Sequence, residues 1–361
     1  MLSLPPEVQF DVLKCLNFEQ LFSLKQANHC FLNFIKRYEG GLARMEFFKL
    51  SLIDAETMDS QQPSPFAYID LEPLDFEFLL DGQLLEKWKA AIAKSVPLFL
   101  HGVEDDITSV VQIDKAGLAQ ACATNLSAYP KGMPASTDKN PRHILKLPNI
   151  PKNLEEKIIV RCWLEQLFNC AFIQTEYVDV IFNPEMINLL FDNEDKTSLK
   201  QFYGKSFALL VAPQARNDII EIFLNFGLNR SVVYHKFVML EGEISELHTN
   251  ILFNIVINQR KKLPEVFFGY CDSSELYERI VEYITTSKDF SKMVSNVYLV
   301  YNSRNNVRLS DKAQNVQNKQ LDGSPSTEYQ IANIYNPKVK FLFVNAEQSG
   351  LYYTRIRKME E

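Results

Sequence analysis

Residues 4–37 read LPPEVQFDVLKCLNFEQLFSLKQANHCFLNFIKR, and their spacing predicts three short helices. The first helix opens at Pro5-Pro6, because proline in the first turn loses no hydrogen bond. Asn17 and Gln20 have the spacing of a capping box, which predicts the start of a second helix. The pair Gly40-Gly41 predicts the end of the third helix.

This N-terminal segment has more apolar side chains than a unit of its size can bury. Val8, Val12, Leu13 and Leu16 recur at helical spacing and form an apolar stripe. An isolated unit of about 40 residues cannot hide all of its Leu, Val and Phe side chains. Another domain or another protein should therefore cover some of them. A helical cap on the rest of the chain and a docking module both remain open at this point.

The segment resembles an F-box, the motif by which substrate receptors bind the Skp adaptor of cullin–RING ubiquitin ligases. It aligns without a gap over residues 4–35. The matching positions are Leu4, Pro5, Glu7, Val8, Val12, Leu13, Leu16, Leu21 and Leu24. The sequence departs from the pattern at Gln20 (usually Asp), Asn28 (usually Cys or Ser) and Phe31 (usually Trp). The resemblance implies that the matching residues, together with Phe31, bind the adaptor.

Composition limits the other possibilities. The chain has 361 residues, 46% hydrophobic and 12% aromatic, enough for two or three domains with a large core. A formal charge of −7 argues against nucleic acid as the main partner. We find no apolar run near the roughly 20 residues that cross a bilayer, and no secretory signal. The six scattered cysteines are typical of reduced core thiols. We therefore expect a cytoplasmic or nuclear protein with no membrane segment.

The fold class predicted for the remainder is α/β, with repeated strand-helix units. We divide the chain into an F-box (1–45), a linker and irregular α/β segment (46–152), and an α/β repeat-like substrate-binding domain (153–361). Strands are predicted at Val178–Phe182, Phe207–Val211, Val232–Leu240, Val266–Tyr270 and Val297–Tyr301. They recur about every 30 residues, which is near the period of longer leucine-rich repeats. The leucine-rich-repeat consensus is missing, so an open parallel sheet remains the alternative.

Three polar stretches are predicted to lack regular structure. Residues 58–75 read as a linker, and residues 124–151 as a loop rich in Pro, Ser and Asn. Residues 302–335 are expected to form a long polar loop near one rim of the sheet. Ligands bind where such loops converge, so Arg304 and Arg308 are the candidate client-binding residues.

Catalytic motifs are not evident. The sequence has no GxSxG, P-loop, GxGxxG or HExxH pattern, and its five histidines are dispersed. The acidic triplet 104–106 is interpreted as a solvated turn. We therefore expect no catalytic residue, metal or cofactor. Two hypotheses remain: a substrate receptor that links a client protein to a Skp–cullin–RING ligase, and an α/β ligand-binding protein or enzyme with an N-terminal helical cap.

Overall fold

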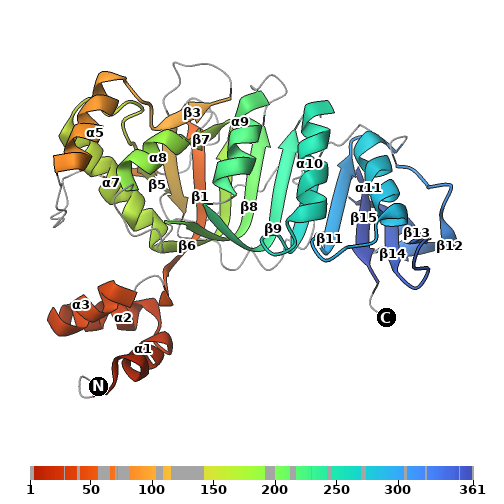
Figure 1. Cartoon of the computed structure of the whole chain (residues 1–361), viewed down its shortest axis with the longest axis horizontal. Helices are drawn as coiled ribbons and strands as arrows, with labels where there is room; N and C mark the ends of the chain where they lie inside the picture. Colours follow the sequence, from red (N-terminus) through yellow and green to blue (C-terminus); the bar gives the residue numbers. More distant parts are fainter. Residues whose placement is uncertain are drawn as a thin grey trace.

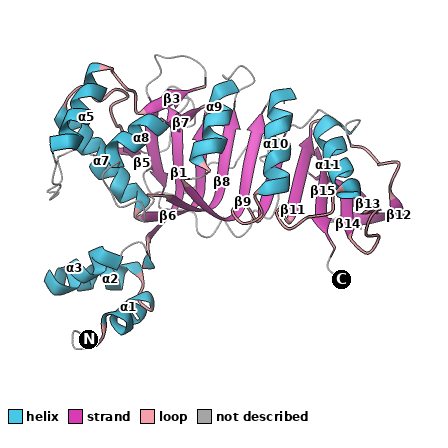
Figure 2. Ribbon diagram, viewed as in Figure 1, coloured by secondary structure: helices cyan, strands magenta, loops and turns pink. Residues whose placement is uncertain are grey.

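The protein is mixed α/β, with one large sheet and three N-terminal helices that lie below it (Figure 1, Figure 2). It is represented by a computed structural model. The structure describes residues 4–27, 29–38, 41–55, 66–69, 71, 82–102, 109–114, 142–191, 200–211, 217–228, 230–241, 246–269, 274–304, 307–321, 323–348 and 350–359.

The three predicted N-terminal helices are present as α1 (Pro6–Lys14), α2 (Phe18–Ala27) and α3 (His29–Tyr38). The capping box that starts α2 is also confirmed. The backbone N–H of Gln20 donates to Asn17 Oδ1 at 2.9 Å, and the Asn17 N–H donates to Gln20 Oε1 at 3.0 Å. Two otherwise unsatisfied donors are therefore capped reciprocally.

The centre of the large sheet is a run of parallel strands. They are β1 (Met45–Asp54), β6 (Cys170–Val178), β8 (Phe202–Val211), β9 (Ser231–Glu241), β10 (Glu265–Gly269) and β11 (Asn296–Tyr301). Their order across the sheet is the same as their order in the chain. Each parallel strand is thus added beside the one before it.

Helices connect these strands. They are α5 (Gly82–Ala93), α7 (Leu154–Phe168), α8 (Pro184–Phe191), α9 (Asn217–Ile222), α10 (Glu246–Asn258) and α11 (Ser274–Thr286), and a short π-helix, η2 (Phe223–Gly227), continues α9. Figure 2 shows α9, α10 and α11 side by side on one face of the sheet. Phe207, Phe237 and Phe268 of the strands are fully buried in one core with Ile280 and Ile284 of α11. Burial of these side chains is the main force holding the layers together.

Both flanks of the sheet are less regular. One flank adds β4 (Ser109–Asp114), β5 (Arg142–Leu145) and β2 (Phe66–Tyr68), while β3 (Phe99–His101) pairs with β7 (Val180–Phe182) in a separate two-stranded sheet. The other flank is an antiparallel meander of β15 (Leu351–Lys358), β14 (Lys340–Gln348), β13 (Ser324–Ala332) and β12 (Gln314–Leu321).

The strand predicted at Val178–Phe182 is wrong in its position. The parallel strand is β6, which ends at Val178, and Asp179 then takes a left-handed backbone angle (φ 52°) before β7 begins. The reason is that β6 has polar residues such as Gln174 and Glu176 on the face away from the core. The apolar run that follows is itself a strand, β7, but it pairs antiparallel with β3 and is not one of the parallel strands. The other four predicted strands are present as β8 to β11, although Tyr270 lies outside the described residues.

The prediction of a continuous loop over residues 302–335 is also wrong. This segment contains β12 and β13, joined near Gly323, whose positive φ of 84° suits glycine. Every side chain of β12 is exposed, so its sequence has no apolar alternation to reveal a strand. The predicted linker (58–75) contains the strand β2, and the predicted loop (124–151) contains the strand β5. Most of the remainder, and the acidic triplet 104–106, lies outside the described residues.

The boundary drawn at residue 153 does not divide the sheet. β1 and β4, which precede it, pair with each other, and β1 also pairs with β6, which follows it. Leu50 and Leu52 of β1 are fully buried in the main core. Within the described part of residues 46–152, β1, β4 and β5 are therefore inner strands of the sheet that continues after residue 153.

Candidate functional site

An exposed apolar stripe runs along α1 and the residues just before it. Leu4, Val8 and Val12 follow one another at four-residue spacing, which places them on one face of the helix. Their side chains are 40%, 44% and 39% exposed in the whole chain. The rest of the protein therefore leaves this surface open to solvent.

A small closed core lies beneath this stripe. Leu13, Leu21, Ile35 and Leu42 are 0%, 3%, 1% and 7% exposed. They show that the three helices form a packed unit. The apolar stripe is thus surplus to the packing that this unit needs.

The ten predicted adaptor-binding residues fall into three groups. The exposed ones are Leu4, Pro5, Glu7, Val8 and Val12, the half-buried ones are Leu16, Leu24 and Phe31, and the fully buried ones are Leu13 and Leu21. The last two support the helices from inside and have no surface to offer a partner. Only the first two groups can make direct contact in this arrangement.

Phe22 was not among the predicted residues, yet it is half exposed. It lies on α2 beside the buried Leu21, and its ring stacks on Phe18 with 6.2 Å between the centroids. Successive residues on a helix point about 100° apart, so the burial of one directs its neighbour outward. The sequence shows two adjacent apolar residues, Leu21 and Phe22. Which of them faces inward depends on packing against α3.

Local contacts hold the stripe in a defined shape. Gln9 Nε2 donates to the Leu4 carbonyl at 2.6 Å and so fixes the first residue of the stripe. The rings of Phe10 and Tyr38 lie 4.8 Å apart and join α1 to the end of α3. A Cβ atom at Gly41 would come within 2.9 Å of the Phe10 ring, so a larger residue there would require that ring to shift.

Arg44 attaches this helical unit to the sheet. Its Nη1 donates to the Phe168 carbonyl at 2.6 Å, and its guanidinium lies 3.6 Å above the centre of the Tyr203 ring. Figure 1 shows the three helices below the start of β1, away from the helices that cover the sheet. The unit therefore extends from the lower edge of the sheet on an anchored connection.

The candidate client-binding arginines lie beside α11. Arg308 Nη1 is 2.9 Å from Glu278 Oε1, and its carbonyl accepts hydrogen bonds from Tyr329 (3.3 Å) and Asn345 (3.0 Å). Four residues later, Lys312 Nζ donates to Thr285 Oγ1 at 3.3 Å. The segment from Arg308 to Lys312 thus runs along α11. Arg304 is exposed at the start of this path.

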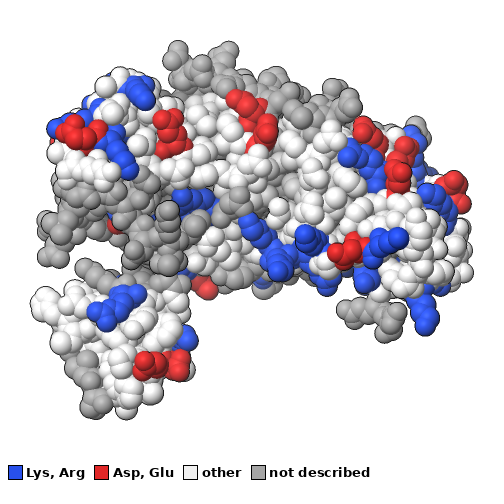
Figure 3. Space-filling view, in the orientation of Figure 1, with Lys and Arg blue, Asp and Glu red and all other residues white. Residues whose placement is uncertain are grey.

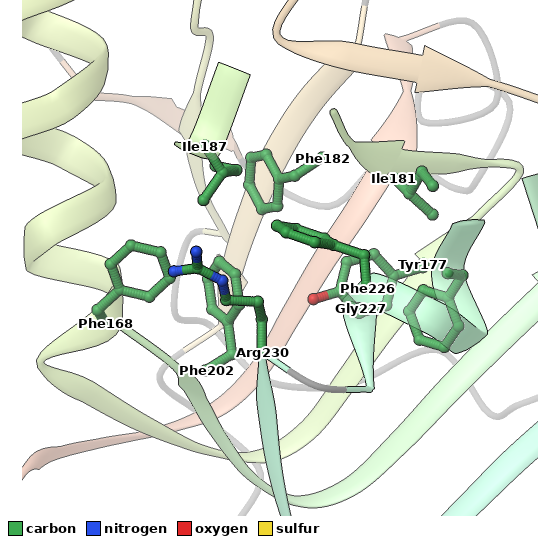
Figure 4. A pocket seen from close by; sticks show the side chains of 10 residues that line it. Phe168, Tyr177, Ile181, Phe182, Ile187, Phe202, Phe226, Gly227 and Arg230 are labelled. Carbon is green, nitrogen blue, oxygen red and sulfur yellow. The ribbon is translucent and has the colours of Figure 1, made fainter. Parts of the chain in front are cut away.

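A small pocket lies between the sheet, α7, α8 and η2 (Figure 4). Its lining is aromatic and aliphatic, and Arg230 is the charged residue among the described side chains that form it. That guanidinium already donates to Asn188 Oδ1 at 2.9 Å and lies 5.3 Å from the Phe226 ring centre. Burial raises the pKa of Tyr177, which keeps its hydroxyl protonated. These groups supply neither a base nor a nucleophile.

Cys162 and Cys170 lack nucleophilic character, whereas Cys15 and Cys30 are exposed free cysteines, so the expectation of core thiols is wrong for those two. Burial raises the pKa of Cys162 to about 11 and that of Cys170 to about 12, so both stay thiols at neutral pH. Within the described ranges, no three His, Cys, Asp or Glu side chains lie close enough together to hold a metal ion. In the same part of the chain, no helix is long and apolar enough to span a membrane.

Comparison with known proteins gives one match. Residues 69–240 are similar to a family described as "Domain of unknown function (DUF8381)". The matched region begins just after β2 and ends within β9, so it crosses residue 153 as the sheet does. No curated protein and no solved structure matches the chain. The family description assigns no activity, so function must be argued from the surfaces above.

Proposed function

We propose that this protein is the substrate receptor of a Skp–cullin–RING ubiquitin ligase in the cytoplasm or nucleus. In this proposal α1 to α3 form an F-box that binds the Skp adaptor, and the α/β sheet binds a client protein. The protein itself performs no covalent step. It brings the client to the ligase.

The observation that carries the proposal is the exposed stripe of Leu4, Val8 and Val12. These three residues occupy positions of the F-box pattern, and they are exposed although the unit beneath them has a closed core. Contiguous exposed apolar side chains on a soluble protein commonly indicate an interaction site. The same exposure disfavours a helical cap, because a cap would bury this stripe against the rest of the chain.

The strand order supports a leucine-rich-repeat-like sheet over an open doubly wound one. In a doubly wound sheet the strand order reverses and helices cover both faces. Here β1, β6 and β8 to β11 follow chain order and α9 to α11 share one face, while β4, β5 and β2 lie on the other side of β1. Such an arrangement offers an extended surface for a protein client.

Reconstitution with a purified Skp adaptor tests the docking step. The full chain should form a stable 1:1 complex in size-exclusion chromatography with light scattering. A chain that begins at residue 43 and lacks the three helices should elute alone, while its circular dichroism spectrum keeps the mixed α/β form. If the truncated chain binds the adaptor as well as the full chain, the F-box assignment is wrong.

A further inference from the structure

Three turns at the lower edge of the sheet form a continuous surface that the proposed docking step does not use. They are residues 259–264 between α10 and β10, residues 287–295 between α11 and β11, and residues 333–339 between β13 and β14. We call this surface the basic ridge. Figure 1 places it on the same side of the sheet as the N-terminal helices.

The ridge is strongly positive although the chain is acidic overall. Its exposed cations are Arg260, Lys261, Lys262, Lys288, Lys292 and Lys338, whereas the whole chain carries a formal charge of −7. Figure 3 shows this concentration of Lys and Arg along the lower edge, beneath α10 and α11. The turns contain one carboxylate, Asp289, which accepts hydrogen bonds from the Ser291 N–H at 2.8 Å and hydroxyl at 3.0 Å. That carboxylate is thus bonded within its own turn.

Hydrogen bonds hold the three turns together. The Arg260 N–H donates to the Lys292 carbonyl at 3.0 Å, which joins the first turn to the second. Asn333 is 2% exposed, and its amide donates to the carbonyls of Ile284 and Ser287, each at 2.8 Å. The third turn is thereby fixed to the end of α11. The cations therefore project from a pre-organised support, which lowers the entropy cost of binding.

The ridge also presents apolar surface. Ile334 and Tyr335 are large hydrophobic residues that are each 61% exposed. Lys288 Nζ lies 5.1 Å from the centre of the Tyr335 ring, so cation and aromatic surface adjoin. Protein interfaces commonly combine aromatic anchors with a charged periphery. This combination is more than a solvated row of lysines requires.

We propose that the basic ridge binds an acidic peptide segment of the client protein, with Ile334 and Tyr335 contacting an apolar side chain of that segment. This deepens the proposed function, on which it rests, by assigning the client a chemistry and a position. We choose an acidic partner because of the charge distribution. The positive ridge attracts an anionic segment, and the acidic remainder of the chain repels that segment from other surfaces.

Fluorescence anisotropy on the full chain tests the ridge. The probe is a short fluorescein-labelled peptide rich in Glu and Asp around a central Leu-Phe pair. The triple variant Lys261→Glu, Lys262→Glu, Lys288→Glu should weaken binding by at least about tenfold at low salt. Ile334→Ser with Tyr335→Ser should weaken the affinity that persists at about 0.3 M salt, where exposed charges are screened.

The matched control is Lys94→Glu, Lys146→Glu, Lys152→Glu, which changes the net charge equally through exposed lysines far from the ridge. It should keep most of the affinity. Equal losses in both triple variants, or unchanged binding in the ridge variant, overturn the proposal. Tighter binding to phosphatidylserine vesicles or to single-stranded RNA than to the peptide also overturns it. The assay contains no adaptor. A negative result would therefore reject peptide binding at the ridge and leave the proposed adaptor docking untouched. Likewise, failure of the adaptor experiment would not change the peptide affinity measured here.

Discussion

The Nζ atom of Lys49 on β1 lies 2.7 Å from Glu176 Oε2 on β6. The two side chains are 21% and 6% exposed, so this ion pair is largely shielded from solvent. Asp114 of β4 lies opposite Lys49 in register. Burial raises the Asp114 pKa, while the charges of Arg142 and Lys49 act in the opposite direction. The strand that follows the N-terminal helices is therefore fixed inside the sheet by charge as well as by apolar burial.

This position of β1 predicts where the chain can be cut. A chain that begins at residue 43 should fold without the three helices, because β1 and the Arg44 anchor are kept. A chain that begins at residue 56 should lose the cooperative transition, because β4 and β6 lose the strand between them. Thermal unfolding followed by circular dichroism compares the two. A cooperative melt at the same temperature for both would show that β1 is dispensable.

The ion pair itself should show coupling. Glu176→Gln removes the carboxylate beside Lys49 and should lower the free energy of unfolding by about 1–3 kcal/mol, less than for a fully buried pair because Lys49 is partly exposed. Combining Glu176→Gln with Lys49→Met should cost less than the sum of the two single changes. Urea denaturation measures all four proteins. Strictly additive losses would mean that the two charges do not interact.

Lys157 gives a prediction about pH. Its side chain on α7 is fully buried with Nζ 3.6 Å from Met186 Sδ, and burial lowers its pKa from 10.5. Between the folded pKa and 10.5 the unfolded chain binds more protons, so this group makes stability rise with pH over that window. Lys157→Met should add about 1–3 kcal/mol at neutral pH.

The same substitution should remove that rise. The check is urea denaturation of both proteins from about pH 7 to about pH 10. The difference between their free energies of unfolding is plotted against pH, so that the contribution of tyrosine titration, which both proteins share, cancels. The advantage of Lys157→Met should shrink as pH increases. A difference that stays constant, or a less stable variant at neutral pH, would contradict the account.

Features that depend on neighbouring residues could be predicted from the sequence. Features that depend on tertiary contacts could not. The Asn17–Gln20 capping box acts within one turn, so α2 could be predicted to begin there. The strand β12 could not, because an exposed edge strand buries no side chain. Helical spacing likewise could not tell that Leu21 is buried while Phe22 is exposed, since packing against α3 decides it. The sequence pattern contained the candidate docking residues, but it could not separate supporting side chains from exposed ones.

The candidate client-binding arginines can now be tested without disturbing the fold. Arg304→Glu with Arg308→Glu removes one exposed ion pair to Glu278, which is worth about 0–1 kcal/mol, so the melting temperature should change little. Deleting residues 304–327 would instead remove β12 and part of β13. Proximity labelling in cells should lose clients with the double arginine variant and keep the ligase subunits. An unchanged client set would exclude both arginines from client binding.

The exposed stripe on α1 allows the sharpest comparison. Val8→Asp with Val12→Asp places charges on side chains that are 44% and 39% exposed, so the helical unit should still fold. The matched control is Val316→Asp with Leu321→Asp on β12, where the exposed fractions are 47% and 40%. Leu16→Ala and Phe31→Ala are poorer probes, because both side chains pack against the small core and their loss would also loosen it.

The central claim is tested most directly by isothermal titration of the purified Skp adaptor into these full-length proteins. Burying charge at such an interface should cost about 2 kcal/mol or more, which is a loss of affinity of about 30-fold. We expect that loss for the Val8→Asp, Val12→Asp protein, with the control binding like the parent. Equal affinity for the α1 variant and the parent, or no binding of the adaptor by the parent chain, would contradict the assignment as a ligase substrate receptor.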